Sequence, residues 1–97
     1  MIIVTGIFPI NPKKRAEAVA ALNIAVAATE QEAGCITYRF YEDIDAPCRF
    51  HVYEEWESAE HLAAHGKSAH IAELRAAMPN ILAGAPTLSR YEATELT

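Results

Sequence analysis

The order in which strand-like and helix-like segments follow one another limits the fold of this chain most, because only 97 residues are available. Segments rich in β-branched and aromatic residues alternate with Ala-rich segments whose apolar residues recur at helical spacing. The expected elements are a strand at 2–9, a helix at 12–33, strands at 35–43 and 49–56, short helices at 58–66 and 68–79, and a last strand at 87–96. With the short helices taken as one connection, the order is β-α-β-β-α-β.

Residues that favour helix ends set these boundaries. Asn11 before Pro12 provides an N-cap and a proline at the first helical position, and Gly34 is the expected C-terminal cap of that long helix. Ser68 is a good N-cap for the last helix. Pro79 is expected to close it, because proline lacks the N–H that a continuing helix needs.

This order predicts a single α+β domain, residues 1–97, with a ferredoxin-like arrangement in which both helical connections lie on the same face of one antiparallel sheet. The other face of the sheet is then bare. The first strand nevertheless carries apolar residues on both sides, with Ile2 and Val4 on one and Ile3 and Ile7 on the other. The simplest cover for a bare apolar face is the same face of a second copy. We therefore expect a homodimer, arranged as a dimeric α+β barrel.

Charge and hydropathy exclude several classes of function. The net charge of −5 argues against a nucleic-acid-binding protein, which normally presents a basic surface. The one basic cluster, Lys13 to Arg15, is typical of a solvated turn. No apolar run approaches the roughly 20 residues that span a bilayer, and the first residues lack the pattern of a signal peptide. We expect a cytoplasmic protein that binds neither nucleic acid nor membranes.

No metal site is expected from the cysteines and histidines. Cys35 and Cys48 have no Cys-x-x-Cys spacing, and they fall near opposite ends of a predicted hairpin, too far apart for a disulfide. His61 and His65 share a helix face at the spacing of metal ligands. However, Leu62 stands where the zinc-protease pattern needs Glu, and no third ligand is marked.

Potential chemistry is concentrated between residues 50 and 70, across a predicted strand-to-helix junction. An extended chain places Glu54 and Trp56 on the same side of the strand. Trp56 fits a plain core as well as a ligand pocket. A carboxylate that points into a core is costly unless it is paired, so Glu54 either lines a pocket or forms an ion pair with an arginine such as Arg39 or Arg90.

The segments EAGCITYRFY, from Glu32, and YEEWESAEHLAAHGKSAH, from Tyr53, resemble the antibiotic biosynthesis monooxygenase (ABM) family, including its quinol monooxygenases. The most specific part is Glu-x-Trp ending at Trp56, followed by His65 and by Ser-x-His ending at His70. The resemblance implies a dimeric α+β barrel. For the characterised enzymes it also implies oxygenation of phenolic or quinol aromatics by O₂ without metal or flavin, so no cofactor is expected. Other members of the family have no known reaction.

The resemblance implies a pocket between the sheet and the helices, with Trp56 at its wall and His65 reaching in from the helix. An enzyme without a cofactor needs an electron-rich anion to react with O₂, so it must supply a base, a dry aromatic pocket and donors that stabilise the anion. His65 suits the base, because imidazole titrates near neutrality. The predicted site has catalytic residues His65 and Trp56 and substrate-binding residues Glu54, His70, Tyr38 and Phe40.

The sequence leaves two other functions open. The same barrel can serve as a non-enzymatic dimeric binding or stress-related module that holds an apolar ligand, because a fold does not fix a function. Haem degradation belongs to another branch of the superfamily, in which an Asn on the first strand joins the Trp and the His. Residues 2–9 contain no Asn, and Asn11 lies past the strand. Oxygenation of a small aromatic is therefore the first expectation, ligand binding the second and haem degradation the last.

Overall fold

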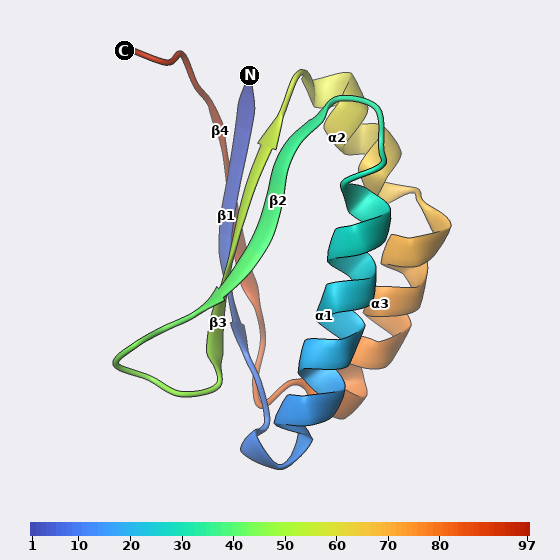
Figure 1. Cartoon of the computed structure of the whole chain (residues 1–97), viewed down its shortest axis with the longest axis vertical. Coiled ribbons are helices and arrows are strands. Elements are labelled where there is room, and N and C mark those ends of the chain that lie inside the picture. Colours follow the sequence, from blue (N-terminus) through green and yellow to red (C-terminus); the bar gives the residue numbers. More distant parts are fainter.

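The computed structural model describes residues 1–97 and has two layers, a four-stranded antiparallel sheet and a layer of helices that covers one of its faces (Figure 1). The elements in chain order are β1 (Ile2–Pro9), the short 3-10 helix η1 (Pro12–Lys14), α1 (Arg15–Thr29), β2 (Cys35–Glu42), β3 (Arg49–Trp56), α2 (Ala59–Gly66), α3 (Ala69–Ile81) and β4 (Thr87–Glu92). The strand order β2-β3-β1-β4 confirms the predicted α+β ferredoxin-like fold, with α2 and α3 together forming the second connection.

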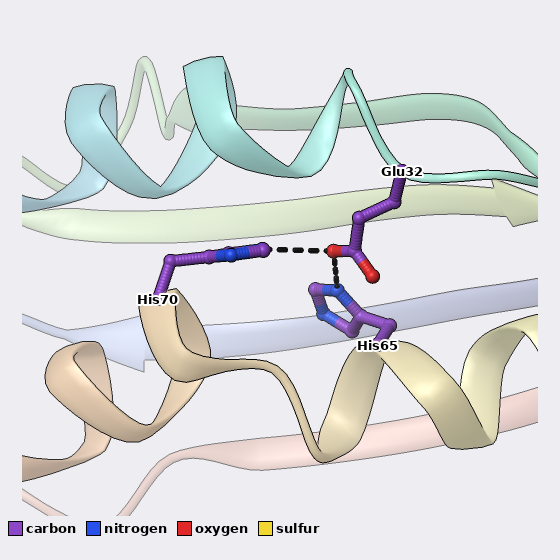
Figure 2. Close-up of side chains that lie close together, drawn as sticks. All are labelled: Glu32, His65 and His70. Carbon is purple, nitrogen blue, oxygen red and sulfur yellow. Dashed lines mark hydrogen bonds and ion pairs between the residues drawn. The ribbon is translucent and has the colours of Figure 1, made fainter.

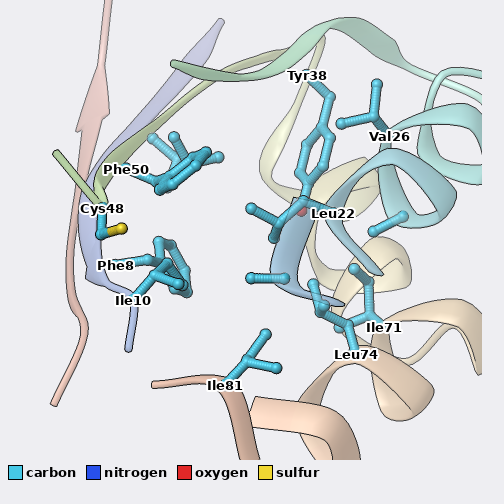
Figure 3. Close-up of a cluster of buried hydrophobic side chains, with 14 of the residues drawn as sticks. Phe8, Ile10, Leu22, Val26, Tyr38, Cys48, Phe50, Ile71, Leu74 and Ile81 are labelled. Atoms are coloured by element: carbon cyan, nitrogen blue, oxygen red, sulfur yellow. The ribbon is translucent and has the colours of Figure 1, made fainter. Parts of the chain in front are cut away.

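The register of β1 against β3 decides which side chains face the helices. Val4 pairs with Glu54 and Phe8 with Phe50, and alternation along each strand puts these four on the helix-covered side. Phe8 and Phe50 are buried in one apolar core with Leu22 of α1 (Figure 3). Val4 is buried in the same core. The core therefore occupies the space between the sheet and the helix layer.

Ser58 and Ser68 cap α2 and α3, as predicted. The hydroxyl of Ser58 accepts a hydrogen bond from the backbone N–H of His61 at 3.2 Å, and that of Ser68 accepts one from Ile71 at 3.4 Å. Because the second cap follows the end of α2 so closely, the chain turns directly from one helix into the next. This turn brings His65, in the last turn of α2, next to the start of α3.

The predicted helix at 12–33 is too long at both ends. Its first residues form η1, and α1 ends at Thr29. The chain then makes tight turns, because it must reverse direction to enter β2. Gly34, expected as the helix cap, lies in this turn with a φ of 79°, and a Cβ at this position would clash with the ring of His61.

Two other boundaries also differ from the prediction. Pro79 does not close α3, which continues to Ile81. A proline so near the helix end removes only one of the last hydrogen bonds, and the turn after it is held by the buried side chain of Ile81. The strand predicted at 87–96 stops at Glu92, because Glu92 pairs with Ile2, where β1 begins, and no strand residue remains beyond it to pair with.

The second face of the sheet carries no helix (Figure 1). Its side chains include Ile7, Tyr41 and Tyr91, each at least one-third exposed. The two cysteines, Cys35 and Cys48, are free thiols at opposite ends of the β2–β3 hairpin. No helix combines the length and the apolar character needed to cross a lipid bilayer.

Replacing Leu22 by Ala is expected to destabilise the fold. Leu22 is 3% exposed, so its truncation removes buried apolar surface and leaves a cavity, which lowers the free energy of unfolding by about 2–5 kcal/mol. Ile24 lies on the same helix but is 66% exposed, so Ile24→Ala should change that free energy by less than about 0.5 kcal/mol. Urea unfolding of both variants measures the difference, and equal losses would contradict the assigned orientation of α1.

Candidate active site

A cavity of about 340 Å³ lies between the sheet and the helices α2 and α3. Eight of its twelve lining residues are apolar, among them Phe8 and Leu74. Its four other lining residues are Tyr38, Glu54, His65 and Arg75. The cavity thus combines an apolar body with a small set of groups that can exchange protons or bear charge.

His65 enters this cavity from the last turn of α2 and is 6% exposed. Its Nδ1 lies 2.6 Å from the carboxylate of Glu32, whereas its Nε2 has no hydrogen-bond partner in the protein. The ring packs against Trp56 and Tyr38, with centroids 4.7 and 5.2 Å away. Burial lowers the pKa of His65, and the carboxylate of Glu32 partly offsets that effect. His65 is therefore held as a neutral imidazole with one unpartnered nitrogen.

Glu32 lies in the turn after α1 and binds two histidines with one oxygen. Its Oε2 is 2.6 Å from Nδ1 of His65 and 2.8 Å from Nε2 of His70 (Figure 2). His70, at the start of α3, was predicted to bind substrate, but it does not line the cavity. It hydrogen-bonds to Glu32 and Ser68, and its ring centroid lies 6.1 Å from that of His65.

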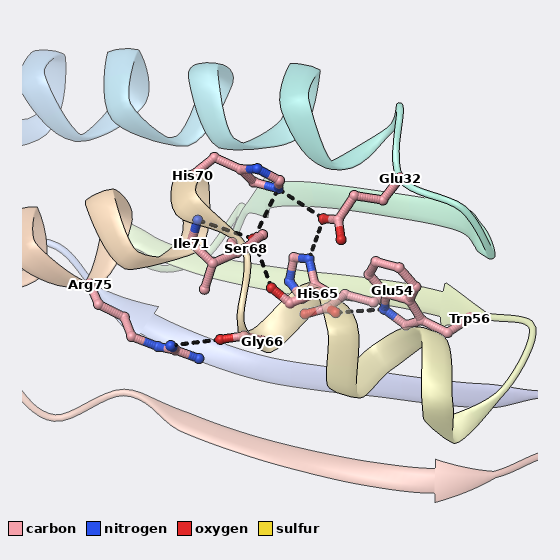
Figure 4. Close-up of polar contacts among 9 residues, drawn as sticks. All are labelled: Glu32, Glu54, Trp56, His65, Gly66, Ser68, His70, Ile71 and Arg75. Atoms are coloured by element: carbon pink, nitrogen blue, oxygen red, sulfur yellow. Dashed lines mark hydrogen bonds and ion pairs between the residues drawn. The ribbon is translucent and has the colours of Figure 1, made fainter.

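Glu54 and Trp56 form a buried pair on the helix-facing side of β3 (Figure 4). The indole Nε1–H donates a hydrogen bond to Oε1 of Glu54 at 2.9 Å. Burial raises the pKa of Glu54, and the indole donor opposes that rise. The ion pair considered for Glu54 does not form, because Arg39 pairs with Glu30 instead and no other arginine bonds to Glu54.

Trp56 does not line the cavity, although the sequence predicted it as the pocket wall. It is fully buried behind Glu54 and His65, which it contacts through its N–H and its ring face. The alternation of a strand predicts the side on which a residue lies, not how far it sits from a cavity. The structure therefore puts Trp56 behind the residues that face the cavity.

Of the two predicted aromatic contacts, one lies in the cavity. Tyr38 lines it, and burial, with the nearby charge of Glu54, raises the pKa of its phenol well above the usual range. Phe40 does not line the cavity, because its ring packs edge-on against Phe8 and Tyr38, with centroids 5.6 and 5.7 Å away. Phe40 thus belongs to the core that supports the cavity.

Sequence reasoning missed Arg75 as a cavity residue. Arg75 is the one cation in the cavity lining, its Nη1 donates to the carbonyl of Gly66 at 2.9 Å, and it has no ion-pair partner. Its position four residues after the buried Ile71 on α3 could have pointed to it, although Arg75 itself is exposed. Glu32 was missed as well, since it contacts His65 across more than thirty residues of chain.

The metal-ligand spacing of His61 and His65 does not produce a shared site. His61 turns to Ser58, with its Nδ1 2.7 Å from the serine hydroxyl. The residues whose types suit a divalent metal are instead Glu32, His65 and His70, whose ligand atoms lie within 4.8 Å of one another. In this structure the three are hydrogen-bonded to one another.

Replacing Trp56 by Phe is expected to raise the pKa of Glu54 further, because the buried carboxylate loses its only side-chain donor. Tyr53→Phe is the matched control. The hydroxyl of Tyr53 donates to Glu55 at 2.7 Å, on the opposite side of the same strand, so its loss should leave Glu54 unchanged. Carboxyl ¹³C NMR titration measures both variants. A pKa of Glu54 that is unaltered in Trp56→Phe would contradict this assignment.

The raised pKa of Glu54 also predicts how stability depends on pH. A carboxyl whose pKa is higher in the folded state stabilises the fold below its unfolded-state pKa, and this contribution is lost as pH rises through the folded-state value. Glu54→Gln should therefore flatten the fall of the free energy of unfolding across that acidic window. Urea unfolding at a series of pH values tests this, and an unchanged slope would contradict it.

The family model described as antibiotic biosynthesis monooxygenase matches residues 1–77 of the chain. A protein of Synechocystis sp. (strain ATCC 27184 / PCC 6803 / Kazusa), described as the uncharacterized protein sll1783, is 29% identical over 94 residues. That match covers 97% of this chain, and the chain spans 64% of the length of that relative. All polar residues of the cavity fall within the span of the family model.

Solved structures with the same fold support this relationship. A Caulobacter crescentus protein, provisionally described as an antibiotic biosynthesis monooxygenase, has a TM-score of 0.92 at 27% identity, over 97% of this chain and 90% of that one. A Bacteroides thetaiotaomicron protein of unknown function, described as a possible oxidoreductase, has a TM-score of 0.87 at 29% identity, over 95% of this chain and 96% of that one. Because the family model covers most of its length, this chain belongs to the antibiotic biosynthesis monooxygenase family.

Proposed function

We propose that this protein is a cofactor-independent monooxygenase that oxygenates a small phenol or quinol with O₂. One observation carries the proposal: an apolar cavity is lined by a buried histidine whose pKa is lowered by burial and whose Nε2 has no hydrogen-bond partner in the protein. A cavity of about 340 Å³ is within the usual range for small-molecule sites and can enclose one or two aromatic rings. Membership of the family supports the oxidoreductase class.

The proposed reaction begins with proton transfer to His65. Its Nε2 takes the proton of the phenolic O–H, so the ring becomes an electron-rich phenolate that can react with O₂. A carbon–oxygen bond then forms, the resulting hydroperoxide loses water, and a phenol yields a quinone. The four electrons that reduce O₂ come from the substrate, so phenol and O₂ give quinone and water without another reductant.

The other polar residues of the cavity suit the charge that develops in this reaction. Arg75 is the cation that can stabilise the phenolate oxygen. Glu54, with its raised pKa, can donate a hydrogen bond to a carbonyl oxygen when protonated. The apolar lining keeps water away from Glu54, which is 6% exposed, and so strengthens that hydrogen bond, whereas Arg75 is exposed to solvent.

A non-enzymatic ligand-binding role is the second candidate, favoured by the mostly apolar lining of the cavity. Such a module would bind the same rings without consuming O₂. Binding and oxygen uptake must therefore be measured separately.

Oxygen uptake tests the enzymatic proposal. The purified protein, treated with chelator, should consume O₂ with hydroquinones or polycyclic phenols faster than the protein-free control. His65→Ala should lower kcat by at least about a hundredfold, because it removes the base. His61→Ala is the matched control: the residue lies on the same helix but outside the cavity lining, so its activity should stay near that of the wild type.

Two outcomes would count against this function. Tight binding of the same aromatics, with no uptake above the control, would favour the binding module. Uptake that disappears with chelation and returns with added metal would contradict the cofactor-independent mechanism.

We also propose that the helix-free face of the sheet binds a second copy of the chain. This face exposes Ile7, Tyr41 and Tyr91, which lie on three different strands. If the helix-free faces of two copies pack against each other, these exposed side chains become buried between the two sheets. A single chain has no element that covers this face.

A charged substitution on this face tests the proposed dimer. Tyr91→Asp should convert a dimer into monomers, because a carboxylate buried between two sheets is costly. Ile24→Asp, at an exposed position of α1 in the helix layer, is the control and should leave the mass unchanged. Light scattering coupled to size-exclusion chromatography gives the mass. A wild-type protein that is monomeric at micromolar concentration would refute this interface.

A further inference from the structure

We propose that Glu32 and His70 are positioning residues for His65: Glu32 fixes which ring nitrogen of His65 carries the proton, and His70 anchors the carboxylate that does so. The catalytic consequence of this arrangement rests on the proposed function, whereas the arrangement itself can be tested without a substrate. Two contacts carry it, from Oε2 of Glu32 to Nδ1 of His65 at 2.6 Å and to Nε2 of His70 at 2.8 Å (Figure 2).

The contact with Glu32 determines the tautomer of His65. An ionised carboxylate has only acceptors, so the nitrogen that faces it must carry a hydrogen. A neutral imidazole protonated at Nδ1 has its lone pair at Nε2. This is the nitrogen without a partner in the protein, on a side chain that lines the cavity. Glu32 therefore selects the tautomer that can accept a proton from a bound ligand.

Because Glu32 is partly buried, its negative charge interacts strongly with His65. The side chains of His65, Glu32 and His70 are 8%, 17% and 20% exposed, so water screens their interaction less than it would at the surface. When Nε2 of His65 takes the substrate proton, the ring becomes an imidazolium whose Nδ1–H still donates to Glu32. The negative charge of the Glu32 carboxylate then stabilises that cation.

His70 restrains Glu32 from the other side. It comes from the start of α3 and donates to the same oxygen, so the carboxylate is held between two helices (Figure 4). As a second donor, and as a cation when protonated, it competes with His65 for the negative charge of Glu32. Loss of Glu32 and loss of His70 should therefore change the basicity of His65 in opposite directions.

Other charged groups face His65 and bear on any test by pH. The titratable residues around its ring come from the turn after α1, from β2, from β3 and from α3, and they are Glu32, Tyr38, Glu54, His70 and Arg75. Glu32 raises the pKa of His65, whereas burial, His70 and Arg75 lower it. A variant of Glu32 or His70 leaves the other contributions in place.

A divalent metal in this cluster would require the opposite protonation. To bind a metal, the nitrogens of His65 and His70 that face Glu32 would need free lone pairs, so both would have to lose the hydrogens that they donate to it. The positioning role and a metal site are thus mutually exclusive, and one experiment separates them.

The experiment is ¹⁵N NMR of the histidine side chains in the metal-free full-length protein. The wild type should show His65 protonated at Nδ1 and unprotonated at Nε2 above its pKa. Glu32→Gln, which keeps the shape but not the charge, should lower the pKa of His65, and His70→Gln should raise it. His61→Gln, on the same helix but bonded to Ser58, should leave it unchanged.

Three results would overturn the proposal. These are an Nε2-protonated His65 in the wild type, shifts of the same sign in Glu32→Gln and His70→Gln, and stoichiometric Zn²⁺ binding that displaces the Nδ1 proton and is lost in both variants. A purely structural role would not give shifts of opposite sign. Because these measurements need no substrate, they decide the positioning role even where no oxygen uptake is found.

Kinetics then test the catalytic consequence in a protein with measurable uptake. Glu32→Gln should lower kcat by about tenfold or more while KM stays within about twofold, since the base is affected and the cavity lining is not. The acidic limb of kcat should move to lower pH in Glu32→Gln and to higher pH in His70→Gln. If the acidic limb of the pH profile of kcat is the same in both variants as in the wild type, Glu32 and His70 do not affect catalysis through His65.

Discussion

The antiparallel pairing of β1 with β3, at the centre of the sheet, is the interaction on which the core and the cavity both depend. It fixes Phe50 and Val52 toward the helices, where they fill the core, and it puts Glu54 on the same side, where it lines the cavity. A shift by one residue would bring His51 and Tyr53 into the core and turn Glu54 to the helix-free face. The register therefore places the core and the site together.

Two of the buried ionisable side chains in the cavity lining, Glu54 and His65, are each held by a specific partner, and this limits the cost of burying them. The indole of Trp56 donates to Glu54, and Glu32 accepts from His65, so the buried charges have hydrogen-bond partners. The hydroxyl of Thr29 is the one fully buried side-chain polar atom without a partner. Hydrogen bonds thus fix the orientation of Glu54 and His65 in the cavity lining.

The sequence predicted features that depend on near neighbours. The serine caps of α2 and α3 and the common side of Glu54 and Trp56 follow from spacings of two or three residues, and the structure confirms them. The prediction that the first helix continues to residue 33 was wrong, since α1 ends at Thr29. A helix pattern in the sequence does not show where the chain must turn back. The prediction that Trp56 lies at the cavity wall was wrong for a similar reason. The alternation of side chains along a strand shows on which face of the sheet a residue lies, but not how far it lies from a cavity.

The sequence by itself determined the element order, the ferredoxin-like fold and the family, because these depend on local periodicity and on a motif that is continuous in the chain. Only the tertiary structure decided that Glu32 meets His65 and that Arg75 lines the cavity. The contact with Glu32 joins the turn after α1 to the end of α2, and the cavity is lined by residues of the sheet, of two helices and of the segment before β4. Contacts of this kind join residues that are far apart in the chain. They arise from tertiary packing, which leaves no periodic pattern in the sequence.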